Sequence, residues 1–262
     1  MSFEPPVAIR AAYKDWRWSV ASEWADIATT WRLENGDGAT HYLKLGRLSR
    51  SPNARDECDR MRWARQRLPV PEVLDCGTDG TVDWFLTMGL DGCDATAHHL
   101  REQPPQLVAA LARGLAAFHA AAPVDTCPFE FTNTTAIAHV HRRAEQGLID
   151  PDKDLHAQHQ HLTVDTAIEQ LELLAPADAD LVVCHGDYCL PNILLDEAGH
   201  VTGYVDLGEL GIADPWWDIA VGSWSVTWNL GPGWEDLFIS TYGTTPDPRR
   251  IAFYRLLYDL AS

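Results

Sequence analysis

Three short apolar runs separated by polar turns occupy residues 181–208, and this arrangement constrains the fold more than any other part of the chain. The runs cover residues 181–183, 193–195 and 203–205, and a turn over 196–199 has the sequence Asp-Glu-Ala-Gly. Runs of this length bounded by turn residues predict β-strands joined by a hairpin. Asn192 and Asp206 would then emerge at strand ends, on one rim of that hairpin.

Asp187, Asn192 and Asp206 are the polar residues that these turns would present. Phosphoryl transfer from ATP needs a carboxylate to take the proton of an attacking hydroxyl, and oxygen ligands to hold Mg²⁺ on the phosphates. Asp187 is therefore the candidate catalytic base, and Asn192 and Asp206 are the candidate metal ligands. Each residue alone is also an ordinary turn residue, but the strand–turn–strand context favours a phosphotransferase site.

The N-terminal third has the pattern of a small β-rich region. The expected elements are a hairpin over 31–44 whose turn is Asn35-Gly36-Asp37-Gly38, a helix over 53–67 and a strand over 83–88. Lys44 ends the second strand of the hairpin, and Glu57 lies one turn into the helix. Such a pair suits the anchoring of nucleotide phosphates. It is also compatible with a surface ion pair of little energetic worth, although the downstream motif favours the first interpretation.

The rest of the chain is mostly helical in pattern. Residues 106–121 predict a core helix, with His119 as a structural residue. The tryptophans at 216, 217, 224 and 228 favour core packing, with a wall that stacks against substrate as the alternative. His156, His159 and His161 favour a solvated polar segment over a zinc site, because no cysteine or glutamate completes a spaced set of ligands.

The chain is strongly acidic, with a formal net charge of −18 from 38 acidic against 20 basic residues. This charge argues against a nucleic-acid partner and favours a cationic small-molecule substrate, although acidic surfaces also serve solubility. No apolar run approaches the ~20 residues that span a bilayer, and the N-terminus lacks a signal-peptide pattern. Because the six cysteines show no paired spacing, a cytoplasmic protein with reduced thiols and no membrane partner is expected.

Several specific segments together resemble a known family. Protein kinases carry their catalytic residues as H-R-D-x-x-x-x-N and D-F-G, where this chain has His185-Gly186-Asp187 with Asn192, and then Asp206-Leu207-Gly208. The chain resembles the aminoglycoside phosphotransferases over nearly its whole length, and most closely the kanamycin/neomycin 3′-phosphotransferases. The segments that carry the resemblance are 68–74, 127–130, 147–150, 183–193, 211–214, 217–220 and 250–257.

The resemblance implies an α+β, protein-kinase-like fold of two lobes. Residues 1–90 would form a β-rich nucleotide-binding lobe, and residues 91–262 a mainly helical lobe for catalysis and substrate binding. The co-substrate would be ATP or GTP with Mg²⁺, and the activity would confer antibiotic resistance. The implied site residues are Asp187 as catalytic residue, Lys44, Glu57, Ser22, Met88 and Leu90 for the nucleotide, and Asn192 and Asp206 for the metal.

The chain departs from the pattern of the family in the phosphate loop and in the substrate site. The run 21–26, which matches the loop over the phosphates, contains no glycine, and Glu209 stands where the family has arginine. Asp154 is the one carboxylate kept from the family's acidic cluster, with Asp150 just upstream, and Asp259 matches a substrate-binding glutamate. These four acids, Asp150, Asp154, Glu209 and Asp259, are the candidate substrate contacts.

The departures leave alternative functions open. One is a kinase that acts on streptomycin at its 3″-hydroxyl or on another hydroxylated small molecule. Another is a pseudokinase that binds nucleotide without catalysis; the intact Asp187, Asn192 and Asp206 count against it, and the glycine-free run 21–26 counts for it.

Overall fold

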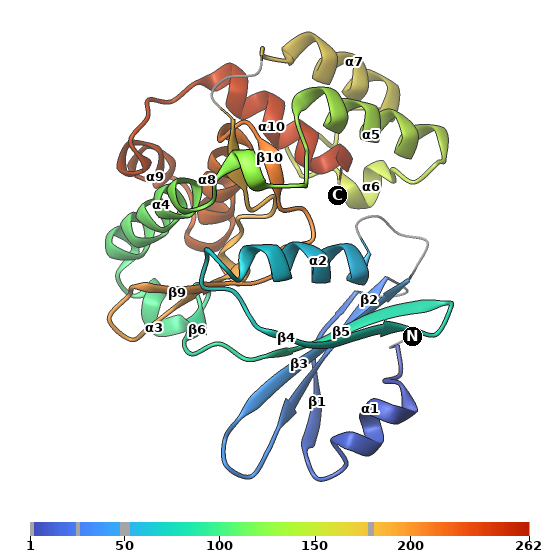
Figure 1. Ribbon diagram of the computed structural model, residues 1–262. Helices are drawn as coiled ribbons and strands as arrows, with labels where there is room; N and C mark the ends of the chain where they lie inside the picture. Colours follow the sequence, from blue (N-terminus) through green and yellow to red (C-terminus); the bar gives the residue numbers. More distant parts are fainter. Residues whose placement is uncertain (1–2, 25–26, 48–52, 178–180, 262) are drawn as a thin grey trace. The chain divides into compact units, whose positions relative to one another are not determined.

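The computed structural model describes residues 3–24, 27–47, 53–177 and 181–261. The chain divides into two compact units (Figure 1). The first contains Met1–Gly92 together with Thr202–Glu209, and the second contains Cys93–Val201 together with Leu210–Ser262. An antiparallel sheet dominates the first unit and helices dominate the second. The α+β architecture predicted from the sequence is therefore confirmed.

The sheet of the first unit has five antiparallel strands in the order β1-β2-β3-β5-β4. Their bounds are β1 Arg17–Trp24, β2 Ala28–Glu34, β3 Thr40–Arg47, β4 Val73–Thr78 and β5 Val82–Met88. The predicted hairpin is β2–β3, and its turn is closed by the Asn35 side chain, which accepts hydrogen bonds from the N–H groups of Asp37 (3.0 Å) and Ala39 (2.8 Å). The hairpin places Lys44 in the central strand, opposite Thr30 and Phe85.

The two faces of this sheet have different coverings (Figure 1). Leu43 and Leu45 of β3 pack in an apolar cluster with Ile9 of helix α1 (Val7–Ala12). Because successive residues of a strand point to opposite faces, Lys44 lies on the other face. Helix α2 (Ala54–Ala64) packs there and brings Glu57 to it.

Helix α2 begins with a complete capping box. The Asn53 side chain accepts hydrogen bonds from the N–H groups of Arg55 (3.0 Å) and Asp56 (2.9 Å), and the Asp56 side chain accepts from the N–H of Asn53 (3.2 Å). These bonds satisfy N–H groups that have no partner within the helix. The cap therefore fixes the start of the helix one turn before Glu57.

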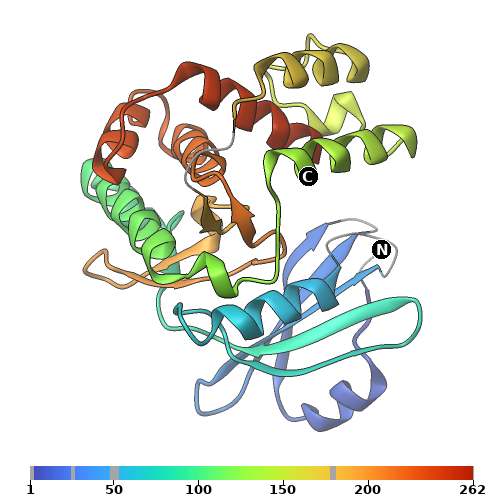
Figure 2. The same ribbon diagram turned by 45° about the horizontal axis from the view of Figure 1, so that its top comes forward.

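The second unit is built mainly from helices (Figure 2). They are α3 His98–Arg101, α4 Pro104–Ala121, α5 Asn133–Glu145, α6 Pro151–Asp154, α7 Val164–Leu174, α8 Trp216–Leu230, α9 Glu235–Tyr242 and α10 Pro248–Ala261. Helix α8 is buried from Trp216 to Val226 and packs against α4, α9 and α10. A Cβ at Gly222 of α8 would lie 2.9 Å from Phe238 and 3.1 Å from Tyr188, so this helix needs glycine there to approach its neighbours closely.

Short strands position the predicted catalytic segment. They are β6 Cys93–Asp94, β7 Val182–Cys184, β8 Ile193–Leu195, β9 Val201–Tyr204 and β10 Gly211–Ala213. Strand β7 pairs with β10 and strand β8 pairs with β6, so the loop between β7 and β8 is held at both ends. Strand β9 follows β8 after the predicted turn and carries the chain into the first unit. In the described part of the chain, no helix combines the length and apolarity needed to cross a bilayer.

The cap of α2 generates the first prediction. Asn53→Ala should lower the free energy of unfolding by about 1 kcal/mol, because it leaves two N–H groups at the helix start without their side-chain acceptor. Urea unfolding at pH 7 measures the change. Asn53→Ser is the matched control, since serine caps helices about as well as asparagine; an equal loss in both variants would contradict this role of the cap.

Candidate active site

The candidate base Asp187 lies in the loop between β7 and β8 and is hydrogen-bonded on both of its carboxylate oxygens. The Asn192 Nδ2 donates to Asp187 Oδ2 at 2.8 Å and to the Asp187 backbone carbonyl at 3.0 Å. The Tyr258 hydroxyl of α10 donates to Asp187 Oδ1 at 3.1 Å. Donors on both oxygens fix the orientation of the carboxylate. With its nitrogen bonded in this way, Asn192 retains its amide oxygen as the atom suited to a hard cation such as Mg²⁺.

A buried carboxylate, that of Asp218, is hydrogen-bonded to the backbone of this loop. Asp218 of α8 accepts the backbone N–H of His185 at 2.6 Å and that of Gly186 at 2.9 Å. Gly186 has a φ of 91°, a conformation that favours glycine, and its carbonyl accepts the Trp217 Nε1–H at 2.5 Å. Helix α8 therefore fixes the loop backbone immediately before Asp187.

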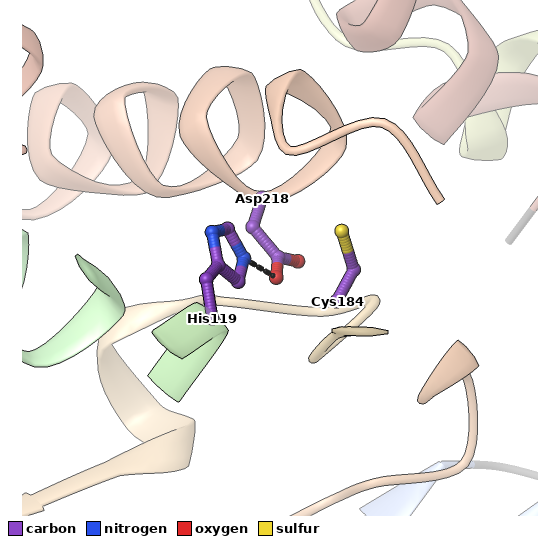
Figure 3. A group of neighbouring side chains, drawn as sticks. All are labelled: His119, Cys184 and Asp218. Carbon is purple, nitrogen blue, oxygen red and sulfur yellow. Dashed lines mark hydrogen bonds and ion pairs between the residues drawn. The ribbon is translucent and has the colours of Figure 1, made fainter. Parts of the chain in front are cut away.

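His119, Cys184 and Asp218 converge in this support (Figure 3). His119 Nε2 bonds Asp218 Oδ2 at 2.9 Å, and the Tyr242 hydroxyl bonds His119 Nδ1 at 2.9 Å. Burial raises the pKa of the Cys184 thiol well above its ordinary value, so the thiol stays protonated. The group has the composition of a metal site, but its ligand atoms are engaged in hydrogen bonds. His119 is a structural histidine, as the sequence predicts.

In the first unit, Lys44 bonds two carboxylates. Its Nζ lies 2.7 Å from Glu57 Oε2 and 2.7 Å from Asp206 Oδ1. Burial alone would lower the pKa of Lys44, but the charges of Asp206 and Glu57 outweigh it and raise this pKa well above its ordinary value. Burial raises the pKa of Glu57, and the Lys44 charge opposes this effect. Because the Glu57 side chain is only 5% exposed, the pair is not the solvated surface ion pair considered above.

Asp206 has an unusual backbone. Its φ is 60°, and no other non-glycine residue in the described ranges has a positive φ. This left-handed conformation is uncommon for residues with a side chain, and it concentrates at functional sites. Asp206 follows β9 in the segment that belongs to the first unit, as does the half-buried Glu209. The Asp206 oxygens are donors of the type that Mg²⁺ prefers.

The other nucleotide candidates lie along the sheet of the first unit. Ser22 is in strand β1, beside an irregularity of pairing between Val20 and Ser22. Residues 21–24 are therefore strand where a loop was expected, and residues 25–26 of that run lie outside the described residues. Met88 ends β5 and is 43% exposed. Leu90 packs over Gly203, where an added Cβ would meet its side chain.

Comparison with known proteins identifies the family. The chain matches the model of a phosphotransferase enzyme family over residues 25–254. It is 33% identical to an aminoglycoside 3′-phosphotransferase of Streptomyces fradiae, over 95% of this chain and 97% of that protein. The chain belongs to the aminoglycoside phosphotransferase family.

Further relatives agree on the family and differ in the hydroxyl that their names specify. A streptomycin 3″-kinase of Streptomyces griseus is 31% identical over 82% of this chain and 83% of that protein. A crystal structure of an aminoglycoside-3′-phosphotransferase of type VIII has a TM-score of 0.88 at 30% identity, covering 97% of this chain and 96% of that chain. APH(3″)-Id of Streptomyces rimosus, in complex with ADP and streptomycin, has a TM-score of 0.78 at 27% identity, with the same coverage. The predicted kinase-like fold is confirmed, and this aminoglycoside phosphotransferase is a kinase-type transferase.

Two of the acidic substrate candidates of this phosphotransferase have partners within helix α6. Asp150 caps the helix by accepting the N–H of Asp152 at 3.2 Å, and it bonds Lys153 Nζ at 2.5 Å. Asp154 accepts the N–H of Asp150 at 2.8 Å. Both side chains retain exposure, 43% for Asp150 and 26% for Asp154, so both can also meet a ligand.

Asp259 has a different environment from the other acids. Its side chain has no solvent exposure, and it accepts hydrogen bonds from the His156 N–H (2.9 Å), from His156 Nδ1 (2.6 Å) and from His159 Nδ1 (2.6 Å). The expectation of a solvated segment is wrong for His159, which is only 7% exposed, and this carboxylate about 100 residues away also orders the partly exposed His156. His161 is exposed, as expected.

Tyr258 is a residue whose contact with Asp187 sequence reasoning missed. Tyr258 directly precedes Asp259, the residue that the resemblance assigns to substrate binding. Its hydroxyl meets Asp187 across 71 positions, and no local pattern reports a contact of that range.

The histidine–aspartate network generates the second prediction. Burial would raise the pKa of Asp259, but the hydrogen bonds from His156 and His159 more than offset this effect, so the pKa lies below its ordinary value. A carboxyl group with a depressed folded-state pKa stabilises the fold above its unfolded-state pKa, and this stabilisation is lost as pH falls through the folded-state pKa. The wild-type free energy of unfolding should therefore fall between about pH 5 and pH 3.

Asp259→Asn should be less stable at pH 7 and should lose less stability over this acid range. Urea unfolding at a series of pH values measures both quantities. Asp125→Asn, which changes an exposed acid of the same unit, is the control and should follow the wild type. Equal acid sensitivity in the wild type and Asp259→Asn would contradict this assignment.

Proposed function

We propose that this aminoglycoside phosphotransferase transfers the γ-phosphoryl group of ATP to a 3′-type hydroxyl of an aminoglycoside. The observation that carries the proposal is the Asp187 carboxylate, oriented by Asn192 on one oxygen and by Tyr258 on the other. The two relatives named 3′-phosphotransferases, from Streptomyces fradiae and of type VIII, support this choice of hydroxyl.

Asp187 is the proposed catalytic residue. Its carboxylate accepts the proton of the acceptor hydroxyl as the oxygen attacks the γ-phosphorus, and its fixed orientation sets the direction of that hydroxyl. Asn192 and Asp206 are the proposed Mg²⁺ ligands, because amide and carboxylate oxygens suit this ion. When bound, Mg²⁺ neutralises charge on the nucleotide phosphates.

We assign nucleotide binding to residues 1–90 and catalysis with acceptor binding to residues 91–262. Lys44 contacts the phosphates, and Glu57 holds Lys44 in place through their 2.7 Å ion pair. Ser22, Met88 and Leu90 are the further nucleotide contacts. The ADP in the Streptomyces rimosus enzyme favours ATP as co-substrate, and GTP is the alternative to compare with it.

The acceptor is a cationic aminoglycoside in this proposal. Asp150, Asp154 and Glu209 offer carboxylates to its ammonium groups, whereas the buried Asp259 acts through the histidines that it holds. A phosphate dianion on the antibiotic opposes its binding to RNA phosphates by repulsion, which is a route to resistance.

We place the reaction in the cytoplasm, where ATP is available and where cysteines such as the buried Cys184 and Cys189 stay reduced.

A second candidate is phosphorylation of streptomycin at its 3″-hydroxyl. The Streptomyces griseus streptomycin 3″-kinase favours it. Coupled ADP-release assays with kanamycin, neomycin and streptomycin, each with ATP and GTP, separate the candidates, and NMR of the product identifies the modified hydroxyl. Transfer to streptomycin alone would replace the 3′ assignment by the 3″ one.

The third prediction concerns the reacting groups. Asp187→Asn should lower kcat by at least about 10²-fold, the lower range of a general-base contribution, and Asp206→Asn should lower it at least as much through the loss of a metal ligand. Steady-state assays with saturating nucleotide measure both effects, and circular dichroism checks the fold. Near-wild-type turnover in Asp187→Asn would sink the mechanism.

The fourth prediction concerns the nucleotide. Lys44→Ala should raise the KM for ATP about tenfold or more, because it removes a charge-assisted contact with the phosphates. Glu57→Ala should act in the same direction and more weakly, since it only positions Lys44. Lys14→Ala, which changes an exposed lysine of the same unit, is the control. A KM for ATP that stays at the wild-type value in Lys44→Ala would refute the role of this lysine.

A further inference from the structure

An aromatic group of four residues, His156, Trp224, Trp228 and Tyr258, lies beside the proposed base. The rings of His156 and Trp228 are stacked, with centroids 4.6 Å apart and planes inclined by 4°. The centroid of the Trp224 ring lies 4.5 Å from that of His156 and 4.7 Å from that of Trp228. The Tyr258 ring lies 6.2 Å from His156 and 6.3 Å from Trp228. The four rings therefore form one continuous aromatic group.

Internal packing accounts for part of this group only. Trp224 is 5% exposed and belongs to the core, as predicted, whereas the core packing predicted for Trp228 is wrong. Trp228 is 41% exposed, and the His156 side chain is 38% exposed. A stacked pair of rings that both reach solvent presents an aromatic surface that the core does not use.

The aromatic group is held rigidly and is joined to the catalytic loop. Trp224 and Trp228 are four residues apart on α8 and so lie on the same face of the helix. Asp259 bonds the backbone N–H and the ring of His156, which fixes the plane of the imidazole against Trp228. Tyr258, the neighbour of Asp259, donates its hydroxyl to Asp187 Oδ1 at 3.1 Å. The exposed rings are thus connected to the proposed base through a single side chain.

This surface has a chemical preference. The faces of tryptophan and tyrosine rings attract cations and pack against flat, partly apolar rings. A protonated amino-sugar ring offers both a flat face of C–H groups and an ammonium group. The acidic chain, with its net charge of −18, attracts the same ligand from a distance.

We propose that His156, Trp228 and Tyr258 form the acceptor-binding wall of this enzyme, against which a protonated amino-sugar ring stacks while its hydroxyl lies at Asp187. This inference rests on the proposed function and specifies how the acceptor is recognised. Asp259 then serves acceptor binding by orienting His156, without meeting the ligand itself.

The test measures the KM for kanamycin and for ATP in three variants. Trp228→Leu should raise the KM for kanamycin about two- to thirtyfold, the range of a cation–π contact, and leave the KM for ATP unchanged. Trp228→Phe should recover most of the affinity because it restores an aromatic face. Trp234→Leu is the matched control, since Trp234 is also a partly exposed tryptophan of the second unit, and it should leave both constants at wild-type values.

The outcomes separate this inference from the proposed function. If the wild type phosphorylates kanamycin and Trp228→Leu keeps the wild-type KM for it, the aromatic wall is refuted and the proposed function stands. If the wild type phosphorylates no aminoglycoside, the proposed function fails and the wall falls with it. Equal losses in Trp228→Leu and Trp228→Phe, with thermal unfolding unchanged, would also overturn the inference, because an aromatic face would then not be what the acceptor needs.

Discussion

The geometry of the catalytic loop depends on one buried carboxylate. Asp218 has no solvent exposure, and it accepts the N–H groups of His185 and Gly186 together with the Nε2–H of His119. Burial of a charge is costly unless hydrogen bonds compensate it, and these three donors compensate it. Two of these donors belong to the loop backbone. The hydrogen bonds that stabilise the buried carboxylate therefore also fix the position of the loop. Asp187 is the next residue, so α8 fixes the backbone from which the Asp187 side chain projects.

In the first unit, a partly buried cation is likewise compensated by hydrogen-bonded partners of opposite charge. Lys44 lies between Glu57 and Asp206, and each carboxylate is 2.7 Å from its Nζ. Burial raises the pKa of Glu57 to about 7, whereas the pKa of Lys44 is raised well above its ordinary value, so the lysine is held as a cation between two acidic side chains. In the proposed function, this lysine contacts the nucleotide phosphates. Asp206 also has a left-handed backbone conformation. Local strain of this kind is retained most often at functional sites.

The sequence predicts local features well and long-range pairings poorly. The hairpin at Asn35 and the core helix α4 follow from turn chemistry and periodicity, and both are found within a few residues of the predicted bounds. The Lys44–Glu57 pair was predicted because a lysine on a strand and a glutamate on the next helix suit phosphate anchoring, and because the downstream motif favoured this interpretation. His156 and His159 were taken for solvated residues because their partner, Asp259, lies about 100 positions away. The contact between Tyr258 and Asp187 was missed for the same reason, because the two residues are 71 positions apart.

In the proposed acceptor site, a cation can be attracted and bound although few acidic side chains are exposed to it. Electrostatic attraction acts over a Debye length of about 10 Å at moderate salt, so the overall charge of −18 serves it without any particular carboxylate. Contact at the site is a different requirement, because an ammonium group needs a partner within a few ångströms. An aromatic face meets that requirement without a second buried charge. The buried carboxylate of Asp259 costs less when histidines bond it than it would as an isolated ion. In the proposed acceptor site, net charge thus supplies attraction from a distance, whereas the aromatic wall selects the ring.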